Sequence, residues 1–211
     1  MKKKVSIIGF GELGQQFYGF LNDSEDNDFV FFDDIAKQNN LHGAYSFYDY
    51  QKPEFKDASF YVALGYRNLQ IKGEIINELK TLKKKIPNYI HPSCFVNNSA
   101  KLSDASFIYP MCNLDKNVQI GCGTLLNNSV VISHDTVVGN CCYLSPGVIV
   151  SGNVVIGNYT FIGSGSIISN NISIGNNVTI GIGTVVTKNV PDNSNVIGNP
   201  MKIVTKPLHI I

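Results

Sequence analysis

The chain has 211 residues, of which 44% are hydrophobic and 16% charged, so it can bury a core in one large domain or two small ones. Its formal net charge of +1 gives no support for a nucleic-acid or an anionic-membrane partner. The sequence contains no apolar run of about 18 residues, so no membrane span is predicted. The N-terminal sequence MKKKVSIIGF meets glycine at once and has no small-residue cleavage site, so it predicts a first strand rather than a signal peptide.

The first part of the chain, up to about residue 90, alternates strand-like and helix-like segments. In chain order the predicted elements are a strand at 4–10, a helix at 12–22, strands at 28–34 and 58–66, a helix at 68–85, and a short strand or connector at 86–92. Such alternation is typical of a parallel sheet covered by helices. We therefore expect a Rossmann-like α/β domain, half the size of a dinucleotide-binding fold, over residues 1–90.

From residue 96 onward the sequence repeats with a period of six. The first residue of every hexad from 96 to 186, sixteen in all, is Val, Leu or Ile, and a Gly, Ser, Asn, Asp or Thr follows it in all but one. A helix or a simple alternating strand cannot sustain this period, whereas a parallel β-helix can, because each hexad forms one flat side of a coil. Three sides to a coil predict about five stacked coils with the aliphatic residues inside, in a second domain over residues 91–211.

The chain contains five cysteines, an odd number, and no two of them have C-x-x-C spacing. They are Cys94, Cys112, Cys122, Cys141 and Cys142. This usage predicts reduced thiols that fill small positions in a cytoplasmic protein.

The sequence GFGELG has the spacing G-x-G-x-x-G, and it follows a predicted strand and opens a predicted helix. Gly9, Gly11 and Gly14 form the motif, and Asp33 and Asp34 close the next strand about twenty residues later. This pattern is typical of dinucleotide sites, but such a site needs two βαβαβ halves and the first part of the chain provides one. We expect these five residues to hold a nucleotide or nucleotide sugar, with the diphosphate at the helix N-terminus. An NAD(P)-dependent oxidoreductase and a turn that binds nothing are the alternatives.

A half-sized nucleotide domain followed by hexads resembles the sialic-acid-O-acetyltransferase-like family of sugar acyltransferases, in particular its nucleotide-sugar N-acetyltransferases such as that of bacillosamine synthesis. The segments that carry the resemblance span nearly the whole chain: IIGFGELG, FFDD, ALGYRN, NYIHPS, LLNNSVVISHDTVVGN, YLSPGVIVSGNVVIG and VIGNPMKIV. The resemblance implies a left-handed β-helix, acetyl-CoA as co-substrate without a metal, and a homotrimer with active sites between subunits.

His134 and Asp135 are the candidate catalytic pair, in the hexad ISHDTV and outside its inward first position. Acetyl transfer to an amine needs a base that works near neutral pH, as histidine does, and an adjacent acid can orient the ring. The resemblance places the family's histidine–acid pair here, so we expect His134 to be the general base and Asp135 to orient it. It also places Asn127 near the reacting groups. A surface histidine at a corner of the coil is the alternative.

The resemblance further implies contacts to coenzyme A along the later coils. Tyr143 stands where many relatives have a second histidine near the thioester arm. The N–H of Gly152 is the candidate donor to the tetrahedral oxyanion, and Gly181 offers backbone groups. Lys188 and Lys202 are candidate partners of the phosphates, with solvated surface lysines as the alternative.

The predicted function is an acetyl-CoA-dependent N-acetyltransferase of glycan biosynthesis that acts on the 4-amino group of a nucleotide-linked amino-deoxy sugar. A sugar hydroxyl acceptor, as in sialic acid O-acetylation, is the alternative within acyl transfer. The γ-type carbonic anhydrases share the β-helix but hold zinc with three histidines. His134 is the one histidine between residues 92 and 208, so the sequence does not predict such a zinc site. A scaffold without catalysis is the last alternative.

Overall fold

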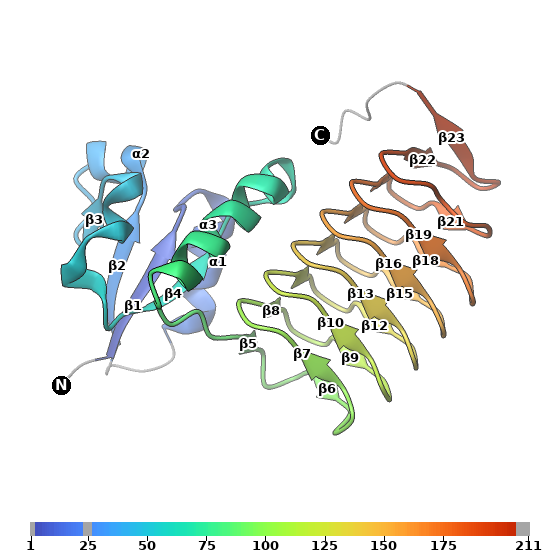
Figure 1. Cartoon of the computed structure of the whole chain (residues 1–211), viewed down its shortest axis with the longest axis horizontal. Coiled ribbons are helices and arrows are strands. Elements are labelled where there is room, and N and C mark those ends of the chain that lie inside the picture. Colours follow the sequence, from blue (N-terminus) through green and yellow to red (C-terminus); the bar gives the residue numbers. More distant parts are fainter. Residues whose placement is uncertain (1–2, 23–26, 206–211) are drawn as a thin grey trace. The chain divides into compact units, whose positions relative to one another are not determined.

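The computed structural model describes residues 3–22 and 27–205 of the chain. The chain divides into two compact units, Met1–Pro87 and Asn88–Ile211 (Figure 1). Within the described ranges, no helix has the length and apolar character needed to cross a membrane.

The first unit is a small parallel sheet with helices. Its elements are β1 Lys3–Ile8, α1 Glu12–Leu21, β2 Asn27–Phe32, α2 Asp34–Gln38, β3 Ala44–Tyr45, η1 Phe47–Gln51, η2 Pro53–Phe55, β4 Ser59–Val62, η3 Tyr66–Asn68 and α3 Leu69–Thr81. The strand order is β3-β2-β1-β4, and each neighbouring pair is parallel. The predicted α/β architecture is confirmed. The predicted elements omitted α2, β3 and the short 3₁₀ helices η1, η2 and η3.

The sheet of the first unit is buried along its two central strands, β1 and β2, and at the neighbouring edge strand β4. Ile7 and Ile8 of β1, Phe32 of β2 and Phe60 of β4 are fully buried, and Leu79 of α3 is as well. Continuous apolar runs of this kind are expected for parallel strands that are covered on both faces. The four described strands form one mononucleotide-binding half, because a full dinucleotide fold has six.

The second unit is a parallel β-helix built from two-residue strands at intervals of six residues (Figure 1). The strands are β5 Tyr89–Ile90, β6 Phe95–Val96, β7 Lys101–Leu102, β8 Phe107–Ile108, β9 Asn113–Leu114, β10 Gln119–Ile120, β11 Leu125–Leu126, β12 Val131–Ile132, β13 Val137–Val138, β14 Tyr143–Leu144, β15 Ile149–Val150, β16 Val155–Ile156, β17 Phe161–Ile162, β18 Ile167–Ile168, β19 Ser173–Ile174, β20 Thr179–Ile180 and β21 Val185–Val186. Two three-residue strands, β22 Asn195–Ile197 and β23 Lys202–Val204, pair antiparallel at the C-terminal end.

The strands of the β-helix stack into three sheets, each of which forms one side of the coil. The orders are β19-β16-β13-β10-β7, then β23-β22-β20-β17-β14-β11-β8-β5, and β21-β18-β15-β12-β9-β6. Partners in neighbouring coils are eighteen residues apart, as Ile132 and Val150 are in the pairing of β12 with β15. The second residue of a strand points inward, and Ile132, Leu144 and Val150 are fully buried. The predicted hexapeptide β-helix is confirmed.

The β-helix is one hexad longer at its start than the sequence pattern indicated. Strand β5 pairs with β8, so it is a side of the first coil rather than the last strand of the α/β unit. The solenoid therefore has about 6 turns instead of about five. The last coil is shorter, since Thr179 pairs with Asn195, sixteen residues later.

Candidate functional site

His134 and Asp135 lie on the corner of the β-helix between β12 and β13. This corner adopts a left-handed backbone in four successive coils, and the residues with that conformation, called here the asparagine column, are Asn117, Asp135, Asn153 and Asn171, with φ of 59, 59, 56 and 59°. Asparagine and aspartate are the residues besides glycine that tolerate this conformation best. The backbone would accept asparagine at 135 as readily as it does in the other coils. A carboxylate at this position is thus not required by the fold.

The side chains of His134 and Asp135 form a close pair. His134 Nδ1 lies 2.9 Å from Asp135 Oδ2, and the two side chains are 47% and 37% exposed. Asn117 Nδ2 donates to the other carboxylate oxygen, Asp135 Oδ1, over 2.8 Å. The hydrogen bond from Asn117, followed by that from His134, holds the pKa of Asp135 below its ordinary value. An ionised Asp135 favours the tautomer with the proton on Nδ1 and leaves Nε2 to accept one.

Gly152 lies one coil above His134 and provides the space for its ring. A Cβ at residue 152 would come within 2.6 Å of both Cε1 and Nε2 of His134. The N–H of Gly152 donates to Asn170 Oδ1 over 2.9 Å. The expected role of this N–H as the oxyanion donor is therefore not supported, because the amide is already paired within the coil. The glycine is explained by the room that it gives to the imidazole.

Asn127 lies on a different corner, between β11 and β12, and contacts Tyr143, the first residue of β14 in the next coil. Asn127 is buried, and its Nδ2 donates to the Tyr143 hydroxyl over 3.1 Å. Asn127 Oδ1 accepts from the N–H of Asn128, and the Tyr143 ring lies 5.8 Å from that of Phe161. The sequence placed Asn127 and Tyr143 near the reacting groups and the thioester arm, and the structure makes them neighbours of each other. The corner that holds His134 is the next one along the chain.

The remaining residues expected to contact coenzyme A lie in the last coils. The N–H of Gly181 donates to Val196 O over 2.8 Å, and its carbonyl accepts from the hydroxyls of Ser166 and Thr184. With both groups paired, the backbone of Gly181 does not support the expected contact. Lys188, after β21, and Lys202, on β23, are exposed to solvent.

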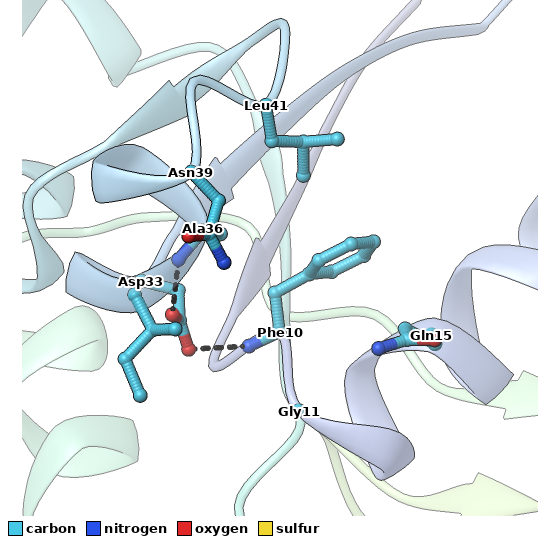
Figure 2. A pocket seen from close by; sticks show the side chains of 8 residues that line it. Phe10, Gly11, Gln15, Asp33, Ala36, Asn39 and Leu41 are labelled. Atoms are coloured by element: carbon cyan, nitrogen blue, oxygen red, sulfur yellow. Dashed lines mark hydrogen bonds between the residues drawn. The ribbon is translucent and has the colours of Figure 1, made fainter.

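The glycine motif borders a cavity of about 380 Å³ in the first unit (Figure 2). The cavity is lined by Phe10, Gly11, Gln15, Asp33, Ile35, Ala36, Asn39 and Leu41. Asp33 lies at its base, where Oδ2 accepts from the N–H of Phe10 over 2.8 Å and Oδ1 from the N–H of Ala36 over 2.9 Å. Asp34 does not line the cavity, since its Oδ1 accepts from the N–H of Phe47 over 3.1 Å. The structure thus supports one of the two acids proposed for this site.

The three glycines of the motif have different reasons to be glycine. Gly9 has a φ of 85°, which favours glycine, and a Cβ on Gly14 would overlap the carbonyl oxygen of Gly9. Gly11 precedes the first turn of α1, has a φ of −70°, and a Cβ there would meet no atom within 4 Å. Gly9 and Gly14 therefore serve the turn and its packing. Gly11 leaves open space at the N-terminus of a helix.

In the described part of the chain, the thiols form no disulfide and the thiols and carboxylates form no candidate metal site. All five cysteines are free thiols, and burial raises the pKa of both Cys112 and Cys142 to about 12. Within residues 3–22 and 27–205, no group of three or more His, Cys, Asp or Glu side chains could hold a metal ion.

Sequence reasoning missed two parts of these sites. Asn117 is close to Asp135 only because the coil repeats every eighteen residues, and that spacing was the signal that could have revealed it. The cavity walls Asn39 and Leu41 follow α2, an element that the sequence pattern did not predict.

Sequence comparison found no matching family model and no matching curated protein. Structural comparison found relatives over nearly the whole chain. The acetyltransferase domain of PglB from Neisseria gonorrhoeae FA1090, in complex with acetyl coenzyme A, is 26% identical with a TM-score of 0.80, covering 97% of this chain and 100% of that one. A variant of GDP-perosamine N-acetyltransferase from Caulobacter crescentus, in complex with CoA and GDP-perosamine, is 22% identical with a TM-score of 0.88 and 98% coverage of both chains. WeeI from Acinetobacter baumannii AYE is 22% identical with a TM-score of 0.86, covering 96% and 100%.

These relatives confirm the predicted fold, an α/β unit followed by a left-handed parallel β-helix. They also confirm the resemblance to the hexapeptide-repeat sugar acetyltransferases, because the match includes both units rather than the repeats alone.

Proposed function

We propose that this protein is an acetyl-CoA-dependent N-acetyltransferase that acts on the 4-amino group of a nucleotide-linked amino-deoxy sugar. The observation that carries the proposal is the pair of His134 and Asp135, with Nδ1 against the carboxylate and the ring seated over Gly152. The same fold in the PglB acetyltransferase domain was solved with acetyl coenzyme A, and in the Caulobacter crescentus enzyme with CoA and GDP-perosamine. Both co-substrates fit a cytoplasmic reaction.

The proposed chemistry is direct attack without a covalent enzyme intermediate. The neutral sugar amine attacks the thioester carbonyl, which forms a C–N bond and a tetrahedral oxyanion. The C–S bond then breaks and the electron pair leaves with sulfur. His134 Nε2 takes one proton from the amine and delivers it to the departing thiolate, so that free coenzyme A and the acetylated sugar result. Asp135 stabilises the imidazolium that forms in between.

The nucleotide part of the acceptor is assigned to the cavity of the first unit. The helix dipole and free N–H groups at the start of α1 favour the diphosphate beside Gly11. Asp33 already accepts two backbone N–H groups, but an ionised carboxylate has further lone pairs for a ribose hydroxyl. A redox cofactor is disfavoured, since the sheet provides one of the two halves that a dinucleotide needs.

We further propose that the active unit is a homotrimer. Between the corner of Asn127 and the corner of His134 lies the sheet of β6, β9, β12, β15, β18 and β21, whose outward residues form an apolar stripe. The apolar residues of this stripe are Phe95, Val131, Ile149, Ile167 and Val185, of which three are exposed, and the exposed Asn113 of β9 interrupts it between Phe95 and Val131. Packing this side around a threefold axis would bury the stripe and would bring the His134 corner of one copy to the Asn127 corner of the next. Lys188 and Lys202 are the proposed partners of the coenzyme A phosphates.

The shared site has a test that uses two inactive variants. If each site takes His134 from one copy and Asn127 from the next, coexpressed His134→Ala and Asn127→Ala chains regain about a quarter of the wild-type activity by random mixing. Each variant alone stays inactive. If the mixture is no more active than its parts, each copy contains its own complete site.

The activity itself is tested by mass spectrometry. The protein is incubated with acetyl-CoA and a panel of UDP-, dTDP- and GDP-linked amino sugars, and a gain of one acetyl group is expected on a 4-amino sugar. Acetylation of a sugar hydroxyl, with every amino sugar left unchanged, would replace this proposal by O-acetyl transfer. Failure with all acceptors would reject both.

A further inference from the structure

We propose that Asn117 is a positioning residue, which fixes the carboxylate of Asp135 so that its second oxygen meets the His134 ring. This inference rests on the proposed function, because it assigns Asn117 a part in the same reaction. Asn117 itself does not touch the imidazole in any recorded hydrogen bond. It acts through Asp135.

The geometry divides the two oxygens of Asp135 between two partners. Oδ1 accepts from Asn117 Nδ2 over 2.8 Å, and Oδ2 lies 2.9 Å from His134 Nδ1. An ionised carboxylate has no proton to donate, so the amide must turn its NH₂ toward it and the orientation of Asn117 is unambiguous. An exposed carboxylate that is held at one oxygen loses freedom to rotate. The other oxygen is then held where it selects the Nδ1–H tautomer.

The asparagine column shows that this contact is specific to one coil. Asn117, Asn153 and Asn171 share the left-handed conformation, so the corner geometry explains asparagine at all three positions. Only at Asn117 does the carboxamide meet the carboxylate of Asp135, one coil above. The left-handed backbone thus explains why residue 117 is an asparagine, but it does not require the hydrogen bond from this side chain to Asp135.

Asn117 is itself supported from the coil below. Its N–H donates to Ser99 Oγ over 2.8 Å, and that hydroxyl donates to Asn97 Oδ1 over 2.8 Å. The supports therefore run up the corner from Ser99 through Asn117 and Asp135 to the ring of His134. Such outer partners fix the orientation of groups that react.

The charges around Asp135 act in the same direction as Asn117. The hydrogen bond from Asn117 is the largest influence that lowers the pKa of Asp135, followed by that from His134, and the charges of Lys116 and His134 add to it. Lys116 remains in place when Asn117 is changed. The contribution of the amide can therefore be measured against a constant background.

The test uses three variants that keep the left-handed corner. Asn117→Gly accepts the conformation and removes the donor, and Asn117→Asp keeps the shape but replaces the donor by a second carboxylate. Asn171→Gly is the matched control, since it makes the same change in the same column, two coils above Asp135. Carbon-13 spectra report the titration of the Asp135 carboxyl, and nitrogen-15 spectra report the His134 tautomer. The chain has four histidines, so loss of one signal in His134→Ala assigns that ring.

In Asn117→Gly and Asn117→Asp we expect the Asp135 titration to move to higher pH and the Nδ1–H tautomer of His134 to lose population. Turnover should fall on the order of 10-fold with an unchanged KM. Asn171→Gly should leave both spectra and the turnover as in the wild type. If Asn117→Gly matches Asn171→Gly in titration and tautomer, the positioning role is wrong, whatever the enzyme acetylates. If the spectra shift as expected but no acceptor is acetylated, the proposed function fails and the Asn117–Asp135–His134 coupling stands.

Discussion

Each of the two units contains a glycine whose missing Cβ leaves space, but what lies in that space differs between them. In the α/β unit a Cβ on Gly11 would meet nothing within 4 Å, whereas in the β-helix a Cβ on Gly152 would meet the ring of His134 at 2.6 Å. Neither residue has the positive φ that favours glycine. The first glycine thus leaves a space open, which we propose for the diphosphate, and the second leaves space for a side chain of the protein.

The proposed function assigns ligand recognition to the α/β unit and the chemical step to the β-helix. The cavity beside Gly11 contains one carboxylate, Asp33, and both of its oxygens accept backbone N–H groups. The corner beside Gly152 contains an exposed histidine with an ionised partner. We propose that the first arrangement binds the nucleotide and that the second moves a proton. Substitutions in the two units should therefore affect different kinetic constants.

The largest expected effect is that of His134→Ala. Loss of the general base should lower kcat on the order of 100-fold or more. Binding of the nucleotide sugar, measured by calorimetry, should remain as in the wild type, because the proposed nucleotide cavity lies in the other unit. Near wild-type turnover would remove His134 from its role. A parallel loss of nucleotide binding would contradict the division between the units.

Gly152→Ala should come next, with a fall in kcat on the order of 10- to 100-fold. The new Cβ displaces the imidazole and separates Nδ1 from Asp135 Oδ2, while the ring can swing into solvent because it is half-exposed. The thermal midpoint should therefore change little. Steady-state kinetics and a melting curve check this together. An unchanged kcat would show that the ring works from a different position.

In contrast to the two preceding variants, Gly11→Ala should change KM and leave kcat unchanged. Its φ of −70° suits alanine and its Cβ meets no protein atom, so the fold should be unaffected. The methyl group would project into the space proposed for the diphosphate and raise KM for the nucleotide sugar by about 10-fold, or about 1.4 kcal/mol, with kcat unchanged. Gly19→Ala, another glycine with open space around it, is the control. Equal KM values for the two variants would show that the diphosphate does not bind beside Gly11.

The sequence predicts the β-helix better than the α/β unit, for a physical reason. Every hexad buries one aliphatic residue, so a single period repeats many times, and Leu144 and Val150 are inside as that period requires. Only the first side of the first coil was missed: Ile90 fits the six-residue phase, but His91 follows it, where nearly all the later hexads have Gly, Ser, Asn, Asp or Thr. In the α/β unit, α2 and β3 are five and two residues long, which is too short for periodicity to reveal.

The candidate site was predictable as a list of residues but not as a set of contacts. The sequence placed Asp135 beside His134, and the structure adds the 2.9 Å contact. The sequence could not show that Asn170 Oδ1 accepts from the N–H of Gly152, because the eighteen-residue repeat places the two residues at the same corner without showing which of their groups pair. Nor could it separate Asp33 from Asp34, since only the position of α2 turns one toward the cavity.

The smallest expected effect concerns a corner of the β-helix where a left-handed backbone favours glycine. Gly147, Gly165 and Gly183 have φ of 68, 66 and 64° at one corner of the β-helix, and Met111 occupies the equivalent place with a φ of 61° and 69% of its surface exposed. A left-handed conformation costs a residue with a Cβ roughly 1–2 kcal/mol, and glycine returns part of this through the greater freedom of its unfolded chain. Met111→Gly should therefore raise the free energy of unfolding in urea by about 0.5 to 1 kcal/mol. Because Met111 buries little surface, no packing loss opposes the gain. A decrease would mean that the Met111 side chain is covered in the native assembly, and that the β-helix uses this corner position for contact with another chain.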